Sequence, residues 1–99
     1  MVKSNDIKKI RSQIDEIDLK ILNLISERKN LVTKVVQFKE RNEIIDEKRI
    51  KDILERLDEE AKKRGIPQTL VQNLWKSMIK SFIAYEEEIF DDVSKKSIK

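Results

Sequence analysis

Residues 7–38 read IKKIRSQIDEIDLKILNLISERKNLVTKVVQF. Apolar side chains recur there in steps of three and four, the pattern of a helix with one apolar stripe: Ile7, Ile10, Ile14, Ile17, Ile21, Leu24, Leu31, Val35 and Phe38. This register requires an apolar residue at position 28, where the chain has Arg28. On a continuous helix Lys39 returns to nearly the same face, about 16 Å further along the axis. Because a charge on a packing surface needs a counter-ion, we expect an internal carboxylate or an acidic ligand to meet both cations.

The composition restricts the chemistry that this chain can perform. Its 99 residues predict one small domain over residues 1–99, and 41% charged residues favour a small helical bundle with a thin core. The net charge of +3 comes from interspersed positive and negative residues, which argues against a nucleic-acid partner. The chain has no Cys, no His and a single Gly. Thiol chemistry, the usual metal sites and Gly-rich phosphate loops are therefore excluded. If the chain is an enzyme, we expect it to work through fixed charges and shape, without cofactor or metal.

The sequence also bears on location. No apolar run approaches the roughly 18 residues that a membrane span needs, and the N-terminal residues lack the apolar core of a signal peptide. These observations predict a cytoplasmic protein with no membrane partner.

The first predicted helix is long for a chain of this size. Ser4, Asn5 and Asp6 can all cap its start, and the stripe carries it to about Glu40 or Arg41. Such a helix is about 50 Å long, whereas a compact 100-residue domain has a radius of gyration near 13 Å. The helix must therefore extend beyond its own globule, which predicts an intertwined homodimer. A plain coiled-coil dimer is the simpler alternative.

Two further helices follow, so the predicted fold class is all-α with three helices per subunit and no strand. The pattern breaks over Arg41–Ile45, after which Asp46 can cap the second helix. Gly65 ends that helix in the left-handed conformation. The third helix starts near Gln68–Thr69, and the tail Ser94–Lys99 is expected to be frayed.

Charges also fall on or beside the later stripes. Glu86 is in register with the apolar residues of the third helix, namely Trp75, Ile79, Phe82, Ile89 and Val93. An internal Arg28–Glu86 salt bridge that fixes the helix register would explain both misplaced charges. Arg11 lies about 80–100° around the first helix from Arg28 and Lys39. It cannot easily share a pocket with them inside one subunit, but it could reach the partner's pocket in a dimer.

The order Ile10-Arg11-x-x-Ile14-Asp15-x-Ile17-Asp18, then Glu27-Arg28, Lys39 and Asp46-x-x-Arg49, resembles the all-helical chorismate mutases over about residues 7–92. The resemblance implies three helices per subunit in an interlocked homodimer with two buried active sites. It also implies the Claisen rearrangement of chorismate to prephenate in aromatic amino-acid biosynthesis. That reaction is pericyclic and needs no nucleophile, metal or proton shuttle, so a chain without His and Cys can catalyse it.

The resemblance further implies how a small dianionic substrate is held. Arg28 and Arg11 of the partner subunit bind its two carboxylates, and Arg49 adds a positive contact. Lys39 faces the ether oxygen, where negative charge grows as the C–O bond breaks. The implied catalytic residues are Lys39, Glu86 and Arg28, and the implied substrate-binding residues are Arg11, Arg28, Lys39, Asp46, Arg49, Ile50, Phe82 and Glu86.

Three positions depart from the commonest family pattern. Ile50 replaces a Glu that helps to hold the substrate's ring hydroxyl, Phe82 replaces a small polar residue, and Glu86 replaces a Gln that donates to the ether oxygen. Ile50 and Phe82 make the ring side more apolar, as in the related isochorismate-pyruvate lyases, which make salicylate. Glu86 occurs in some mutases, including fungal ones.

We predict a stand-alone chorismate mutase. An isochorismate-pyruvate lyase or a 4-amino-4-deoxychorismate mutase on the same pocket is the alternative. From another class, a catalytically silent helical dimer or regulatory module would fit the same pattern.

Overall fold

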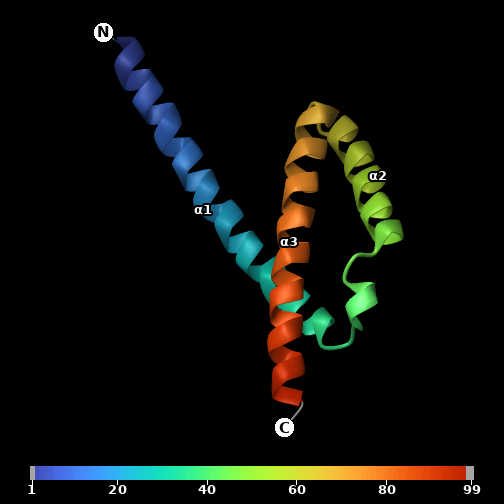
Figure 1. Cartoon of the computed structure of the whole chain (residues 1–99). Coiled ribbons are helices and arrows are strands. Elements are labelled where there is room, and N and C mark those ends of the chain that lie inside the picture. The colour runs from blue at the N-terminus through green and yellow to red at the C-terminus, as the bar shows by residue number, and fades with distance from the viewer. Residues whose placement is uncertain (1, 98–99) are drawn as a thin grey trace. The chain divides into compact units, whose positions relative to one another are not determined.

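The computed structural model describes residues 2–97 and is all-helical there, as predicted, with no strand among these residues (Figure 1). In chain order its elements are the α-helix α1 (Val2–Val36), the short 3-10 helix η1 (Arg41–Glu43), α2 (Glu47–Lys63) and α3 (Gln68–Ser97). The contacts divide the chain into two compact units, Met1–Val32 and Thr33–Lys99. A single domain over residues 1–99 stays a prediction.

The first unit consists of α1 up to Val32. The helix begins at Val2, so the predicted start at Ser4–Asp6 was two or more residues late. Within this unit the seven residues of the apolar stripe are between 46% and 62% exposed in the single chain; they are Ile7, Ile10, Ile14, Ile17, Ile21, Leu24 and Leu31. This row of half-exposed Ile and Leu side chains, interrupted at Arg28, is a long apolar surface of the kind that monomeric proteins rarely expose.

The end of α1 differs from the prediction. The helix stops at Val36 and not at Glu40 or Arg41, so Lys39 is not part of it. The backbone N–H groups of Phe38 and Lys39 donate to the carbonyls three residues earlier, at 2.9 and 3.1 Å. Such bonds tighten the last turn and redirect the chain. Phe38, which we expected on the packing stripe, is 86% exposed in the single chain as a result.

In the second unit α2 and α3 form a helical hairpin (Figure 1). Asp46 caps α2 as predicted, because its Oδ1 accepts from the backbone N–H of Arg49 at 3.0 Å. Gly65 ends the helix as predicted, with φ of 67°. The N–H of Gly65 donates to the Lys62 carbonyl at 3.2 Å, and the N–H of Ile66 donates to the Ala61 carbonyl at 2.9 Å. These two bonds form a Schellman motif, which requires the left-handed residue.

The core of the second unit is small, as the composition predicted. Its buried apolar residues are Val36, Ile44, Ile53, Ala61, Val71 and Ile79. Gln68 donates to Asp58 at 2.7 Å, and Gln72 donates to the Leu54 carbonyl at 2.9 Å, so polar bonds also join α2 to α3. Leu74 of α3 is 55% exposed in the single chain.

The C-terminal helix is longer than expected. The backbone of α3 is helical through Ser97, a stretch that includes most of the tail we expected to be frayed. Ile98 and Lys99 lie outside the described residues. Over the described part of the chain, none of the helices combines the length and the apolar content that crossing a membrane requires.

Candidate functional site

An ion pair between Lys39 and Glu86 marks the candidate site. Lys39 Nζ donates to Glu86 Oε1 at 3.0 Å, and the two side chains are 23% and 10% exposed. Lys39 belongs to the segment after α1, whereas Glu86 lies on the packed face of α3. Because α1 ends before Lys39, this lysine lies in the following segment, where it pairs with Glu86 of α3, 47 residues later in the chain. A counter-ion was expected for this cation, and Glu86 supplies one.

Two aromatic residues of α3, Phe82 and Tyr85, lie within about one helical turn of Glu86 along the helix. The rings of Phe82 and Tyr85 meet edge to face, with centroids 6.4 Å apart and planes at 89°. The Tyr85 hydroxyl and the Thr33 hydroxyl are hydrogen-bonded at 3.0 Å. Phe82 was a predicted site residue, and it is one helical turn before Glu86. Tyr85 was not predicted, because a single aromatic residue on a packed helix reads as core.

A cavity of about 430 Å³ opens where the segment after α1 meets the start of α2. It is lined by Lys39, Asn42, Glu43, Ile45, Asp46 and Glu47. Two predicted site residues, Lys39 and Asp46, therefore share one cavity. One carboxylate oxygen of Asp46 is already used to cap α2, which fixes the orientation of that side chain.

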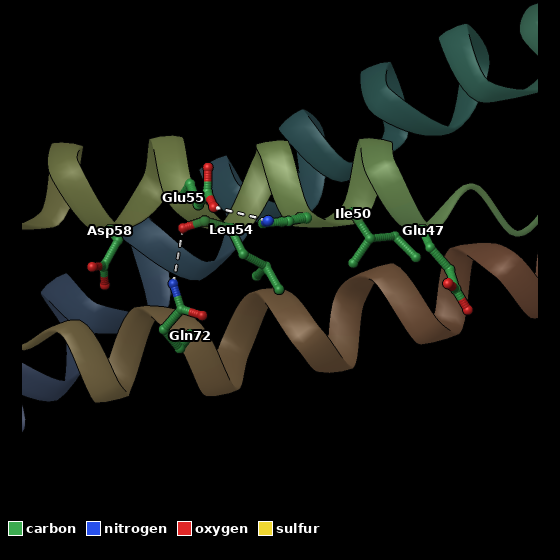
Figure 2. A pocket seen from close by; sticks show the side chains of 7 residues that line it. Glu47, Ile50, Leu54, Glu55, Asp58 and Gln72 are labelled. Carbon is green, nitrogen blue, oxygen red and sulfur yellow. Dashed lines mark hydrogen bonds and ion pairs between the residues drawn. The ribbon is translucent and has the colours of Figure 1, made fainter.

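A second, larger groove of about 530 Å³ lies between α2 and α3 (Figure 2). Its lining residues are Glu47, Ile50, Lys51, Leu54, Glu55, Asp58 and Gln72. Figure 2 shows Ile50 and Leu54 pointing from α2 toward α3, where they give the groove an apolar floor. Ile50 is the predicted site residue that lines this groove. Glu47, which sequence reasoning missed, lines both hollows.

The two remaining predicted cations, Arg11 and Arg28, lie on α1 in the other unit. Arg11 is exposed in the single chain, and Arg28 is half-buried. Their expected approach to the ion pair stays a prediction. Arg49 is exposed at the start of α2, three residues after the cap that orients its turn.

Arg41 is a further residue that sequence reasoning did not select. Its guanidinium carbon lies 5.0 Å from the centroid of the Phe90 ring, and its Nη2 is paired with Asp91 Oδ1. Nothing in the local sequence indicates this role, because one Arg in a polar break is ordinary. Only the pairing of residues 50 positions apart reveals it.

The arrangement is suited to binding an anion and stabilising a growing negative charge. Lys39 has three N–H donors, and Glu86 uses one of them. Glu86 can accept when it is ionised and can donate a hydrogen bond when it is protonated. The Lys39 side chain is partly buried, so less water screens the charge of its ammonium than at an exposed site.

The chain is similar to known proteins over most of its length. The family model described as chorismate mutase type II matches residues 10–87. A bifunctional chorismate mutase/prephenate dehydratase from Buchnera aphidicola (subsp. Acyrthosiphon pisum) is 34% identical over 91 residues, covering 90% of this chain and 24% of that protein. A chorismate mutase from Methanocaldococcus jannaschii is 30% identical over 92 residues, covering 91% of this chain and 93% of that protein.

A second bifunctional chorismate mutase/prephenate dehydratase, from Buchnera aphidicola (subsp. Schizaphis graminum), is 29% identical over 93 residues, covering 92% of this chain and 24% of that protein. The chain thus spans about a quarter of the length of these bifunctional relatives and nearly all of the archaeal one. No solved structure gives a significant match to the chain.

Proposed function

Because the chain belongs to the type II chorismate mutase family, we propose that it catalyses the rearrangement of chorismate to prephenate in the cytoplasm. The reaction breaks the ether C–O bond and forms one C–C bond in the same molecule, so no atom or electron enters or leaves. The proposal rests on the partly buried Lys39–Glu86 ion pair. It supplies a cation for the ether oxygen and, when Glu86 is protonated, a hydrogen-bond donor.

Each predicted residue has a role in this proposal. Lys39 stabilises the negative charge that grows on the ether oxygen, and protonated Glu86 donates a hydrogen bond to the same atom. Arg28 and Arg11 of the partner subunit bind the substrate's two carboxylates, and Arg49 adds a positive contact. The remaining pocket residues hold the ring in its folded, reactive conformer, which is worth several kcal/mol as orientation; they are Asp46, Ile50 and Phe82.

The proposal includes a homodimer in which Arg11 of the partner subunit completes the site. The half-exposed stripe of α1 supports this assembly, because a second copy of the same stripe would bury it. With 35 residues, α1 is about 52 Å long. That length lets one helix contribute to two sites.

Ile50 favours a second candidate on the same pocket. It lines an apolar groove where the commonest family pattern has a Glu. A ring side without that carboxylate suits isochorismate, which an isochorismate-pyruvate lyase converts to salicylate and pyruvate. A 4-amino-4-deoxychorismate substrate is the third possibility.

Incubation of the purified protein with each of the three substrates distinguishes these activities. Prephenate from chorismate supports the proposal, and salicylate with pyruvate from isochorismate supports the lyase instead. Turnover of the amino substrate alone supports the third possibility. A folded dimer that converts none of them supports a silent or regulatory module.

Lys39→Met tests whether the Lys39–Glu86 pair is needed for activity, and Lys62→Met is its matched control. Lys62 is an exposed lysine in the last turn of α2. For the mutase we expect Lys39→Met to lower kcat at least about a hundredfold, because a charge-stabilising donor is lost. Lys62→Met should stay within about twofold of wild type. In a silent module there is no kcat to lower, and Lys39→Met would change only the stability, which should fall because the buried Glu86 loses its counter-ion.

A further inference from the structure

Lys39 reaches Glu86 from a segment outside any α-helix. The segment runs from Gln37 to Asp46, and η1 is its single regular turn. Because a lysine side chain is long and flexible, the place of its ammonium depends on where this segment lies against α3. Whatever holds the segment therefore also positions Lys39.

Arg41 supplies a contact of this kind two residues after Lys39. Its guanidinium carbon is 5.0 Å from the centroid of the Phe90 ring, and its Nη2 pairs with Asp91 Oδ1. Phe90 is four residues, or one helical turn, beyond Glu86 on α3. The segment is thus joined to α3 at two successive turns, by Lys39 at the first and by Arg41 at the second.

The other anchor of the segment is apolar. Ile44 is 4% exposed, whereas its neighbour Ile45 is 56% exposed. Between Lys39 and Ile44 the local backbone bonds, such as Glu43 N–H to the Glu40 carbonyl at 2.9 Å, stay within the segment. They shape the turn of η1 without attaching it to α3. Arg41 is the residue within η1 whose side chain makes described contacts with α3.

Because the contact between Arg41 and Asp91 is exposed, we expect it to position the segment without adding much to the free energy of unfolding. The Arg41 and Asp91 side chains are 59% and 50% exposed. Ion pairs this exposed contribute little to the free energy of unfolding, because water screens both charges. Their effect is geometric: the planar guanidinium stacks on a ring and pairs with a carboxylate at once, which restricts its orientation.

We propose that Arg41 is a positioning residue that, by clamping the segment after α1 onto Phe90 and Asp91, holds Lys39 beside Glu86. Because the catalytic role of Lys39 rests on the proposed function, one arm of the experiment measures kinetics and another needs no substrate.

The kinetic arm compares Arg41→Gln with Arg64→Gln. Arg64 is a matched control, since it is an exposed Arg paired with a carboxylate, Glu60, at the far end of α2. A misplaced Lys39 lowers transition-state stabilisation more than substrate binding, so Arg41→Gln should lower kcat about tenfold and change KM less than about twofold. Arg64→Gln should match wild type. Arg41→Lys keeps the charge without the planar stack and should recover only part of kcat.

The substrate-free arm measures the nuclear Overhauser effect between the ε protons of Lys39 and the γ protons of Glu86 in the full chain. Wild type and Arg64→Gln should show it, and Arg41→Gln should weaken it. In Arg41→Gln, amide exchange should accelerate at Glu43, while α2 keeps its protection. An unchanged kcat together with an unchanged Overhauser effect in Arg41→Gln would overturn the proposal, and so would a KM effect alone.

A second variant covers the case in which Arg41→Gln does not fold. Asp91→Asn removes the carboxylate partner, and Asp92→Asn is its control at the next, exposed position of α3. Asp91→Asn should reproduce the weakened Overhauser effect, and Asp92→Asn should not. If wild type converts none of the tested substrates, the proposed function fails. The Overhauser comparison still decides whether Arg41 positions Lys39.

Discussion

The Glu86 carboxylate has two oxygens, and one of them is engaged in the free protein. Oε1 accepts from Lys39 Nζ at 3.0 Å. Oε2 is then the oxygen that can carry a proton toward a ligand. In this arrangement Lys39 and a protonated Glu86 can act together on the ether oxygen. An ionised Glu86 would instead present negative charge where negative charge must grow.

Glu86→Gln tests this arrangement. The Gln side chain has nearly the same shape, carries no negative charge and can donate an N–H to the ether oxygen. The variant should therefore keep kcat/KM for chorismate within about threefold of wild type, or raise it. Steady-state rates with chorismate check the expectation. A partial loss of activity would show that Glu86 does not act as this donor.

A Gln variant fully inactive on chorismate would have a different meaning. It would favour a sister substrate whose reaction needs the carboxylate itself, and the same series on isochorismate would then retain activity only with Glu86.

The substitution Arg28→Lys tests whether a positive charge alone is enough to bind the substrate at this position. Arg28→Lys keeps the charge but loses the planar fork that binds a carboxylate through two hydrogen bonds. We expect a loss of about 2 kcal/mol of transition-state binding, or about thirtyfold in kcat/KM. Arg56→Lys, at an exposed position of α2, is the control and should keep wild-type kinetics. Equal kinetics for both variants would make Arg28 structural.

At the scale of the elements, local chemistry decided which boundaries could be predicted. The start of α2 at Asp46 and its end at Gly65 are confirmed, because a cap and a left-handed glycine act within one turn. The predicted end of α1, at Glu40 or Arg41, was wrong. The apolar register continues to Phe38, but the helix stops at Val36, where burial and tight turn bonds prevail over periodicity.

The same distinction applies to the candidate site. Lys39 and Glu86 stood out because each is a charge on an apolar register, and the structure pairs them. Arg41 and Tyr85 carry no such signal, since their partners Asp91 and Thr33 lie about 50 residues away in the chain. Tertiary contacts of that kind follow from the fold and not from spacing.

Asp46→Ala tests the cap of α2 directly. Removing the carboxylate that accepts from the Arg49 N–H should lower the free energy of unfolding by about 1 kcal/mol. Asp52→Ala, an exposed acid inside the same helix, is the control and should stay within about 0.5 kcal/mol of wild type. Urea unfolding followed by circular dichroism measures both. Equal midpoints for the two variants would mean that this hydrogen bond does not stabilise α2.

At the scale of the whole molecule, the half-exposed stripe of α1 needs a cover, and a second copy offers the matching surface. Sedimentation at micromolar concentration should therefore give about twice the chain mass of 11.8 kDa. A stable, fully active monomer would contradict the shared site, since Arg11 would then have no route to it.

Mixing two inactive variants tests whether the subunits share their sites. If Arg11 of the partner subunit completes each site, a heterodimer of Arg11→Gln and Arg28→Gln chains contains one site with both arginines intact. Unfolding and refolding an equal mixture should then restore about a quarter of wild-type activity, because about half the dimers are mixed and each has one working site.

A mixture of Arg28→Gln and Lys39→Met chains is the matched control. In the proposed site, Arg28 and Lys39 come from the same chain. Each site of a mixed dimer therefore lacks one of them, and the mixture should stay inactive. Recovery in the control as well, or in neither mixture, would refute the assignment of Arg11 to the partner's site.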